Sequence, residues 1–543
     1  KCQNSSWIYP TLTGPSDRTL TILKRLSCQT VNHSEGTGYM VALTYTVAFE
    51  GVEARQVEVQ CAISPGMPAF SIVGLPDKAV SEARERVRAA LTAMAIALPS
   101  KRITINMSPA DLPKEGSHYD LPIAVALLAA LDVIPQDKAQ ETLALGELSL
   151  DGTLVSVVGA LPAAMAAASE DRTLLCPQTC GAEAAWVGAA NVIGARSLAD
   201  VVRHFTGQSV ITPAQPGEVT RPPHARDLCD VKGQERAKRA LEIAAAGRHH
   251  LLMVGSPGSG KSMLAARLAG ILPLLDPAEA LETSMIHSLS GLLDEGGISR
   301  ERPFREPHHT ASMAAIVGGG RGAKPGEISL AHNGVLFMDE FPEFSRTVLE
   351  TLRQPIETGD VVVARANAHV RYPCKFMLVA AANPCKCGYL SDPARACARV
   401  PQCGEDYLGR ISGPLMDRFD LRVEVPPVAF SDLDLPASGE SSADVAARVT
   451  SARDVQAARF TGHANVRVNA DMEGTLLEEI ASPDSEGRAL LTKVAQRFGL
   501  SARGYHRVLR VARTIADLDG DADVRQPHVA EAVSYRLALS SEV

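Results

Sequence analysis

The segment from residue 255 to residue 262 constrains the fold of this chain more than any other. It has the spacing G-x-x-x-x-G-K-S, and its residues are Gly255, Ser256, Pro257, Gly258, Ser259, Gly260, Lys261 and Ser262. An apolar run before it, 251–254, predicts a buried strand, and the run 263–269 after it predicts a helix. In that setting backbone N–H groups and the helix N-terminus favour a bound phosphate chain. We therefore predict an ATP site in which Lys261 contacts the β- and γ-phosphates and Ser262 holds Mg²⁺.

Two further apolar strands are predicted to end in polar side chains at this site. The run 334–338 is followed by Asp339 and Glu340, and the run 375–382 is followed by Asn383. We expect Asp339 to complete the Mg²⁺ site and Glu340 to polarise the attacking water. Asn383 is a candidate for orienting that water. The cofactors expected from these motifs are ATP and Mg²⁺.

Length and composition set broad limits on the chain. Its 543 residues are 45% apolar, which allows about two to four domains. Aromatic residues make up only 4%, which favours a helix-rich α/β fold over an all-β fold. The net charge of −8 neither indicates nor excludes a nucleic-acid partner, because a local groove can still be basic. No apolar run approaches the roughly 18 residues of a membrane span, so we expect a cytoplasmic protein with no membrane partner.

Changes in pattern divide the chain into parts. Residues 1–39 are rich in Ser, Thr and Asn and lack periodicity, and a regular pattern begins at Met40. We expect a non-native or disordered N-terminal extension, with a genuine disordered tail as the alternative. The remaining parts are an α/β domain, a proline-containing linker, the nucleotide-binding domain and, after a second connection, a helical domain: 40–207, 208–226, 227–427 and 443–543.

The order of these motifs resembles that of the AAA+ ATPases. Beyond the motifs already described, the resemblance places Val231 in the segment leading to the adenine pocket and Asn383 at the sensor 1 position. It places Arg418 in the arginine-finger segment, where it would reach the γ-phosphate of a neighbouring subunit. Arg503 opens a C-terminal helix where sensor 2 is expected.

Three runs carry a narrower resemblance, to magnesium-chelatase-like proteins of the YifB/ComM type: 305–310, 325–332 and 410–414. This resemblance covers residue 40 to the C-terminus. It implies a homo-oligomeric ring, a hexamer, that acts as a helicase on single-stranded and branched DNA. Such a protein would drive branch migration during natural transformation. Two alternatives stay open: an ATPase subunit that inserts Mg²⁺ into a porphyrin, and a AAA+ regulator that remodels protein partners.

The run 114–120 resembles the active-site turn of the Lon protease domain, with two departures. His118 occupies the position of the nucleophilic serine, and Pro162 stands where the resemblance places the catalytic lysine. Ser117 is one position away, but a serine nucleophile needs a base. The resemblance therefore implies a Lon-like α+β domain without protease activity, which we expect to serve assembly or DNA binding.

Four of the eleven cysteines lie on one loop after Asn383. They are Cys385, Cys387, Cys397 and Cys403. In a reducing compartment, clustered cysteines indicate metal binding rather than disulfides. Four thiolates suit a tetrahedral Zn²⁺ site, although the C-x-C opening is tighter than usual. Reduced, unligated cysteines are the alternative.

Two basic segments are candidates for DNA contacts. Arg365, His369 and Arg371 lie in the run 361–372, which predicts a hairpin, and the resemblance implies that such a hairpin enters a central pore. Arg321 and Lys324 follow a run of three glycines. These side chains suit DNA phosphates, and solvated surface charge is the alternative. For the neighbouring pair His308 and His309 we expect a structural or inter-subunit role.

Overall fold

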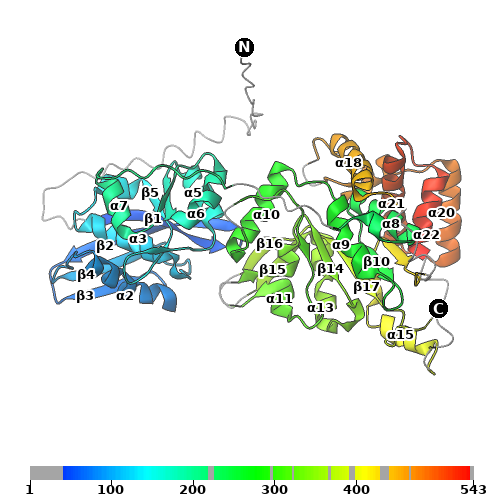
Figure 1. Ribbon diagram of the computed structural model, residues 1–543, viewed down its shortest axis with the longest axis horizontal. Helices are drawn as coiled ribbons and strands as arrows, with labels where there is room; N and C mark the ends of the chain where they lie inside the picture. The colour runs from blue at the N-terminus through cyan, green and yellow to red at the C-terminus, as the bar shows by residue number, and fades with distance from the viewer. Residues whose placement is uncertain are drawn as a thin grey trace, which may run out of the picture. The chain divides into compact units, whose positions relative to one another are not determined.

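The computed structural model describes most of the chain from residue 41 onward. The described ranges are 41–217, 226–293, 297–320, 323–364, 369–390, 395, 398–428, 439–463 and 466–537. The extension predicted over residues 1–39 lies outside them. In the described part, the chain forms two multi-stranded sheets, each with its own helices (Figure 1).

The first sheet has seven strands in the order β3-β4-β2-β1-β5-β8-β9. The strands are β1 (Val41–Glu50), β2 (Glu53–Ser64), β3 (Ala69–Val73), β4 (Arg102–Ser108), β5 (Thr142–Ala144), β8 (Thr173–Pro177) and β9 (Val192–Ala195). β1, β2 and β4 pair antiparallel, and the outer strands join them in parallel. Helix α3 (Asp120–Ala130) is apolar on every side and is buried from Asp120 to Ala129 against this sheet. The other helices of this part are α2 (Lys78–Ala93), α4 (Gln136–Gln140), α5 (Ala160–Ser169), α6 (Gln178–Ala184) and α7 (Leu198–Phe205), and a short hairpin pairs β6 (Glu147–Leu148) with β7 (Leu154–Val155).

The second sheet has five parallel strands in the order β11-β14-β17-β10-β18. They are β10 (Leu251–Val254), β11 (Phe304–Arg305), β14 (Val335–Met338), β17 (Met377–Ala382) and β18 (Leu421–Glu424). Every residue of β10, β14 and β17 is buried, as is typical of parallel strands covered on both faces. The chain leaves β10 toward one side of the sheet and returns on its other side at β18, and ligands bind outside the carboxyl ends of strands at such a point. The α/β fold predicted for this domain is confirmed, and the structure shows that its sheet is parallel.

Helices and two hairpins surround this sheet. The helices are α8 (Glu235–Gly247), α9 (Lys261–Ile271), α10 (Pro277–Ser290), α11 (Met313–Val317), α12 (Glu327–Leu330), α13 (Arg346–Thr351), α14 (Arg353–Thr358), α15 (Gln402–Leu408) and α16 (Gly413–Met416). One hairpin pairs β12 (Gly318–Gly319) with β13 (Lys324–Pro325), and the other pairs β15 (Asp360–Ala364) with β16 (His369–Pro373). The Tyr372 hydroxyl donates to the carbonyl of Ala323 at 2.9 Å, which ties the two hairpins together.

The C-terminal part is helical, as predicted. Its helices are α18 (Ser442–Arg459), α19 (Gly474–Ile480), α20 (Ser485–Phe498), α21 (Ala502–Asp519) and α22 (Gln526–Leu537). Leu509, Ala512 and Ile515 of α21 share one hydrophobic core with α8 and the second sheet. The helices therefore pack directly onto the nucleotide-binding part.

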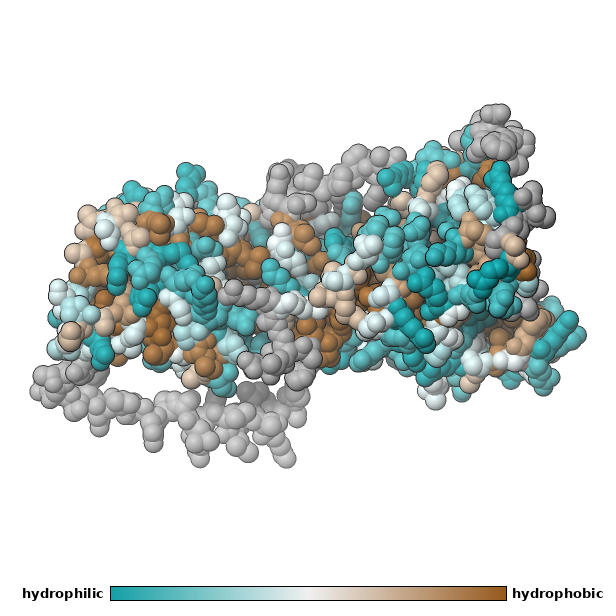
Figure 2. All heavy atoms as spheres, turned by 90° about the horizontal axis from the view of Figure 1, so that it is seen from below, coloured by the Kyte–Doolittle hydropathy of each residue, from teal (hydrophilic) through white to brown (hydrophobic). Residues whose placement is uncertain are grey.

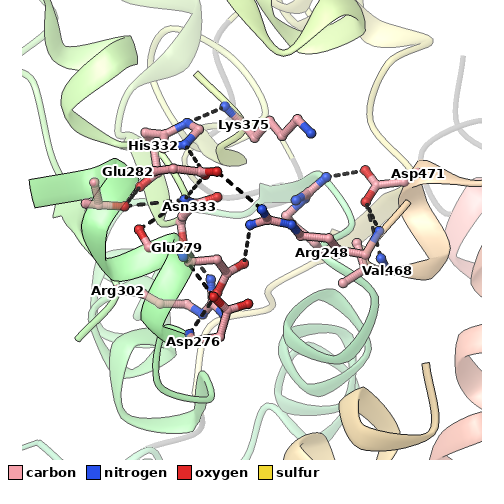
Figure 3. Close-up of polar contacts among 12 residues, drawn as sticks. Arg248, Asp276, Glu279, Glu282, Arg302, His332, Asn333, Lys375, Val468 and Asp471 are labelled. Carbon is pink, nitrogen blue, oxygen red and sulfur yellow. Dashed lines mark hydrogen bonds and ion pairs between the residues drawn. The ribbon is translucent and has the colours of Figure 1, made fainter. Parts of the chain in front are cut away.

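A polar network lies at the amino ends of the second sheet's strands, opposite the predicted phosphate site (Figure 3). Glu279 in the first turn of α10 pairs with Arg302 at 2.8 Å. Arg467 of the C-terminal part reaches Glu282 on α10 at 3.3 Å, and Arg248 after α8 pairs with Asp471. The network therefore joins α10 to the C-terminal part by ion pairs.

Exposed apolar side chains are scattered over the described surface. On the face shown in Figure 2, hydrophobic residues are interspersed with hydrophilic ones. Such scattering is normal for a protein surface. Among the described helices, none has the length and apolar character needed to cross a bilayer.

Candidate functional site

The loop between β10 and α9 has the conformation that its glycines allow. Gly258 and Gly260 have φ of +76° and +92°, in the region that favours glycine. At Gly255 a Cβ atom would lie 2.2 Å from the carbonyl oxygen of Val425, so no larger residue fits. The predicted sequence of strand, loop and helix is therefore confirmed.

Lys261 begins α9 and points back into this loop. Its ammonium donates to the carbonyl oxygens of Gly255 and Ser256 at 2.8 and 2.9 Å, and to Oδ1 of Asn383 at 3.2 Å. Burial lowers the pKa of Lys261, and the nearby carboxylates Asp339 and Glu340 oppose that shift. The structure thus brings the lysine of the first motif to the asparagine that ends β17.

Ser262 and Asp339 meet directly across the same site. The Ser262 hydroxyl donates to Oδ2 of Asp339 at 2.6 Å. A hydroxyl and a carboxylate oxygen are the hard ligands that Mg²⁺ prefers, so these residues fit the ion that the motif predicts. The buried hydroxyl of Ser259 has no hydrogen-bond partner among the described residues, which leaves a donor inside the loop for a phosphate oxygen.

Glu340, which follows Asp339, has an unusual backbone conformation and lies beside His309. Glu340 has φ +49° and ψ +42°, a left-handed conformation that is strained for a non-glycine residue. Its backbone N–H donates to Oδ1 of Asp339 at 2.8 Å. Nδ1 of His309 lies 3.2 Å from Oε2 of Glu340.

Sequence reasoning did not assign His309 or Glu306 to this site. Both follow β11, the strand beside β14, and burial together with the charge of Asp339 raises the pKa of Glu306. The available signal was their position: in a parallel sheet, the ends of adjacent strands meet at one edge. In the sequence, the run 305–310 carries a family resemblance, and its histidines were expected to have a structural or inter-subunit role.

The two arginines assigned by resemblance share one carboxylate. Arg418 is only 5% exposed, and its guanidinium donates to the carbonyls of Arg353 and Pro414 at 3.1 and 2.5 Å. It also pairs with Glu357 at 2.5 Å. Arg503 is exposed at the start of α21 and lies 3.7 Å from the same Glu357 oxygen. In this structure the Arg418 guanidinium is therefore paired with groups of its own chain.

The segment that the resemblance assigns to an adenine pocket lies against the loop at residues 255–262. Val231 is buried in the core of this domain. Nearby, the side chain of Gln234 donates to the carbonyl of Ser259 at 3.4 Å. This contact places the segment containing Val231 beside the loop.

The cysteine loop also contacts the phosphate loop. Cys385 is buried, and its Sγ lies 3.0 Å from Sγ of Cys387. A Cβ at Gly388 would lie 2.4 Å from Pro257, so this turn packs tightly on the loop. Cys403 lies in the first turn of α15, and Cys397 lies outside the described residues. In the described part of the chain, no three potential ligands gather around one point.

Two of the five candidate DNA-contacting side chains can be placed. Lys324 is exposed on β13. Arg371 on β16 is 69% exposed and pairs with Asp360 across its hairpin. Arg321, Arg365 and the side chain of His369 lie outside the described residues. The predicted hairpin over residues 361–372 is confirmed by the pairing of β15 with β16.

In the first sheet's domain, the Lon-like positions are engaged in structural contacts. His118 is buried, with Nε2 3.0 Å from the carbonyl oxygen of Val47, and burial lowers its pKa to about 4. The Ser117 hydroxyl donates to Glu147. Pro162 is buried in the first turn of α5 and offers no base.

Comparison with known proteins finds relatives along most of the chain. Three family models match: "Magnesium chelatase, subunit ChlI" over residues 227–433, "Subunit ChlI of Mg-chelatase" over 57–180, and "Magnesium chelatase, subunit ChlI C-terminal" over 439–536. Competence protein ComM of Haemophilus influenzae is 44% identical over 504 residues, covering 91% of this chain and 97% of that protein. The uncharacterized protein YifB of Escherichia coli is 43% identical over 499 residues, covering 91% and 97%. The magnesium-chelatase 38 kDa subunit of Rhodobacter capsulatus is 26% identical over 359 residues, covering 61% and 93%.

Proposed function

This chain belongs to the magnesium-chelatase-like family that includes competence protein ComM and YifB, and on that premise we propose that it is an ATP-driven DNA motor. As a hexameric ring in the cytoplasm, it would move along single-stranded or branched DNA and promote branch migration during natural transformation. The observation that carries this proposal is the convergence of Lys261, Asn383, Ser262 and Asp339 at one edge of a parallel sheet. The sequence identity of 44% to competence protein ComM, over 91% of this chain, supports the role in transformation.

ATP hydrolysis in this proposal uses groups already held at the site. When ATP binds, the Lys261 ammonium would release the carbonyl oxygens of Gly255 and Ser256 and donate to phosphate oxygens instead, because both kinds of oxygen accept hydrogen bonds from it. Ser262 and Asp339 would hold Mg²⁺, which supplies positive charge against the phosphates when bound. Glu340 would accept a proton from the attacking water, and Asn383 would orient that water.

Assembly would complete each site from a neighbouring subunit. We assign Arg418 to the γ-phosphate of the adjacent protomer and Arg503 to the protomer's own nucleotide. Because both arginines meet Glu357 in the single chain, ring formation would have to release Arg418 from this carboxylate. Glu357 is 42% exposed, so a neighbour can reach the pair.

In this proposal the two hairpins, the cysteine loop and the domain of the first sheet support the motor. The β12–β13 and β15–β16 hairpins, with Lys324 and Arg371, would contact DNA phosphates without reading sequence. The cysteine loop would bind Zn²⁺ through four thiolates that include Cys385 and Cys387. The domain of the first sheet would be Lon-like in fold and would serve assembly or DNA binding.

ATPase assays with and without single-stranded and forked DNA test this proposal. The motor requires that DNA stimulates hydrolysis and that Glu340→Gln abolishes turnover while nucleotide still binds. Matches to the chelatase subunit models favour one rival, a metal-insertion ATPase. That rival predicts no stimulation by DNA at any salt concentration, and a protein-remodelling ATPase predicts stimulation by a protein instead.

A further inference from the structure

The finger segment, residues 417–420, connects helix α16 to strand β18 and carries Arg418. The ring of Phe419 anchors it in a hydrophobic core, where it meets Phe341 edge-on with ring centroids 5.7 Å apart. The backbone of such a connection lies outside helix and sheet, so its buried carbonyl groups need hydrogen-bond donors from elsewhere. Those donors determine where the segment, and Arg418 with it, is held.

Arg536, near the end of α22, bonds the first and third residues of this segment. The residue is 4% exposed. Its Nη1 donates to the carbonyl oxygens of Phe419 and Asp417 at 2.5 and 3.3 Å, and its Nη2 donates to Oδ1 of Asp417. A Cβ at Gly504 of α21 would lie 3.4 Å from Nη2, so the guanidinium lies against that helix. A planar guanidinium presents these donors in a fixed geometry that the ammonium of lysine does not reproduce.

Arg507 on α21 bonds the second and fourth residues of the segment. Its Nη1 donates to the carbonyl oxygen of Arg418 at 2.8 Å and to Oδ1 of Asp420 at 2.6 Å. The side chain of Asp420 is 3% exposed, so loss of Arg507 would leave a buried carboxylate unpaired. Asp417 is 31% exposed, so water can reach its carboxylate after loss of Arg536. Arg536 is therefore the partner that can be replaced with less damage to the fold.

We propose that Arg536 is a positioning residue for the arginine finger, because it fixes the backbone on both sides of Arg418. The inference rests on the proposed function for the action of Arg418 on the adjacent protomer. In the single chain the Arg418 guanidinium is paired with Glu357, and once it leaves this carboxylate the backbone has to define its position. A misplacement of about 1 Å at a reacting site can cost on the order of 100-fold in rate.

Directional complementation in verified mixed rings of the full chain tests this inference. Lys261→Ala chains lack a working ATPase site but keep the finger, and Arg418→Ala chains keep the site but lack the finger. In their mixture, turnover comes from Arg418→Ala sites that face a Lys261→Ala chain. Arg536→Met in the Lys261→Ala chain should lower the recovered kcat about tenfold or more, because the finger supplied by that chain is misplaced. Arg536→Met in the Arg418→Ala chain should leave the recovered kcat unchanged, because that chain supplies no finger.

Arg525→Met is the matched control, because Arg525 immediately precedes α22 and forms an exposed pair with Asp521 at 3.6 Å. It should lower the recovered kcat in neither chain. Asp417→Asn weakens the same contact from its exposed side, without a buried substitution, and should repeat the one-sided loss. Nucleotide titration of Arg536→Met in an otherwise unchanged chain should give the parent Kd for ATP.

The two arrangements separate positioning of the finger from support of the fold. A loss of similar size in both arrangements, for Arg536→Met and for Asp417→Asn, would show a structural role and overturn the inference. Full recovery in both arrangements would overturn it as well. If Arg418→Ala and Lys261→Ala chains show no recovery before Arg536 is changed, the action of Arg418 in trans fails, and the inference falls with that part of the proposed function.

Discussion

Replacing Arg302 with Met removes one partner of a buried ion pair and should destabilise the nucleotide-binding domain strongly. Its guanidinium lies 2.8 Å from Glu279 (Figure 3). It also donates to the carbonyls of Pro273 and Asn333, both at 2.8 Å. The two side chains are 10% and 8% exposed. Burial alone would raise the pKa of Glu279, but the charge and hydrogen bond of Arg302 hold it below its usual value.

The size of the effect follows from what remains after the substitution. Loss of one partner leaves a buried, unpaired carboxylate, which typically costs about 3–5 kcal/mol. Arg467 lies 3.6 Å from the other oxygen of Glu279 and compensates in part, so we expect the lower end, about 3 kcal/mol. For a domain of this size that corresponds to a fall in Tm of roughly 6–12 °C.

Thermal unfolding at neutral pH measures this loss of stability in the parent and in four variants: Arg302→Met, Glu279→Gln, their double variant and Arg399→Met. Arg399→Met is the control, because Arg399 and Asp406 form an exposed pair, 65% and 54% accessible. Such a pair contributes about 0–1 kcal/mol, so Tm should move by less than about 4 °C. Adding Glu279→Gln to Arg302→Met removes the unpaired charge and should recover part of the lost stability.

The stability contributed by the Arg302–Glu279 pair should fall as the pH is lowered. Because the folded-state pKa of Glu279 is depressed, the stability that the pair contributes is present above the unfolded pKa of about 4.3 and is lost as the pH falls through the folded value. In Arg302→Met the buried carboxylate instead gains stability by taking up a proton. The Tm difference between parent and variant should therefore shrink on acidification. A Tm shift no larger than that of Arg399→Met, or a double variant as unstable as the sum of its parts, would refute this reasoning.

Four further outcomes can be measured. Lys261→Ala should weaken ATP binding about tenfold or more, because charge-assisted hydrogen bonds to the phosphates are lost. Glu340→Gln should still bind ATP but turn it over about 100-fold more slowly or worse. Nucleotide titration measures the first effect and steady-state kinetics the second, and full turnover in Glu340→Gln would exclude the role of Glu340. Mixing inactive Arg418→Ala and Lys261→Ala chains should recover part of the ATPase activity, since each supplies what the other lacks, and verified mixed rings without recovery count against action in trans. Metal analysis of protein purified without a metal-affinity column should find about one zinc per chain that is lost in Cys385→Ser; zinc-free, folded parent protein would rule the site out. Arg365→Ala should lose strand displacement and keep basal ATPase activity, and unwinding at the parent rate would show that this arginine is not the moving contact.

Contiguous patterns predicted the nucleotide-binding fold well. The apolar runs around residues 251–254, 334–338 and 375–382 are strands, as expected, and the structure places them in one parallel sheet. The family resemblance drawn from three short runs is confirmed by the comparisons. The assigned roles of Glu340, Arg418 and the cysteines stay predictions, because neither the geometry of one chain nor the comparisons tests them.

What the sequence determined by itself is local. The loop at residues 255–262 needs glycine where φ is positive and where Val425 leaves no room for a Cβ, so its spacing alone identifies it. Tertiary structure decided the rest, since parallel strands bring together side chains that are far apart in the chain and follow no common period. His309 meets Glu340, and Arg302 meets Glu279, only because the strands and helices that carry them are packed side by side. The burial of Arg418 against Glu357 has the same origin: a charged residue in a motif shows its chemistry, but the packing around it decides which partner that charge reaches.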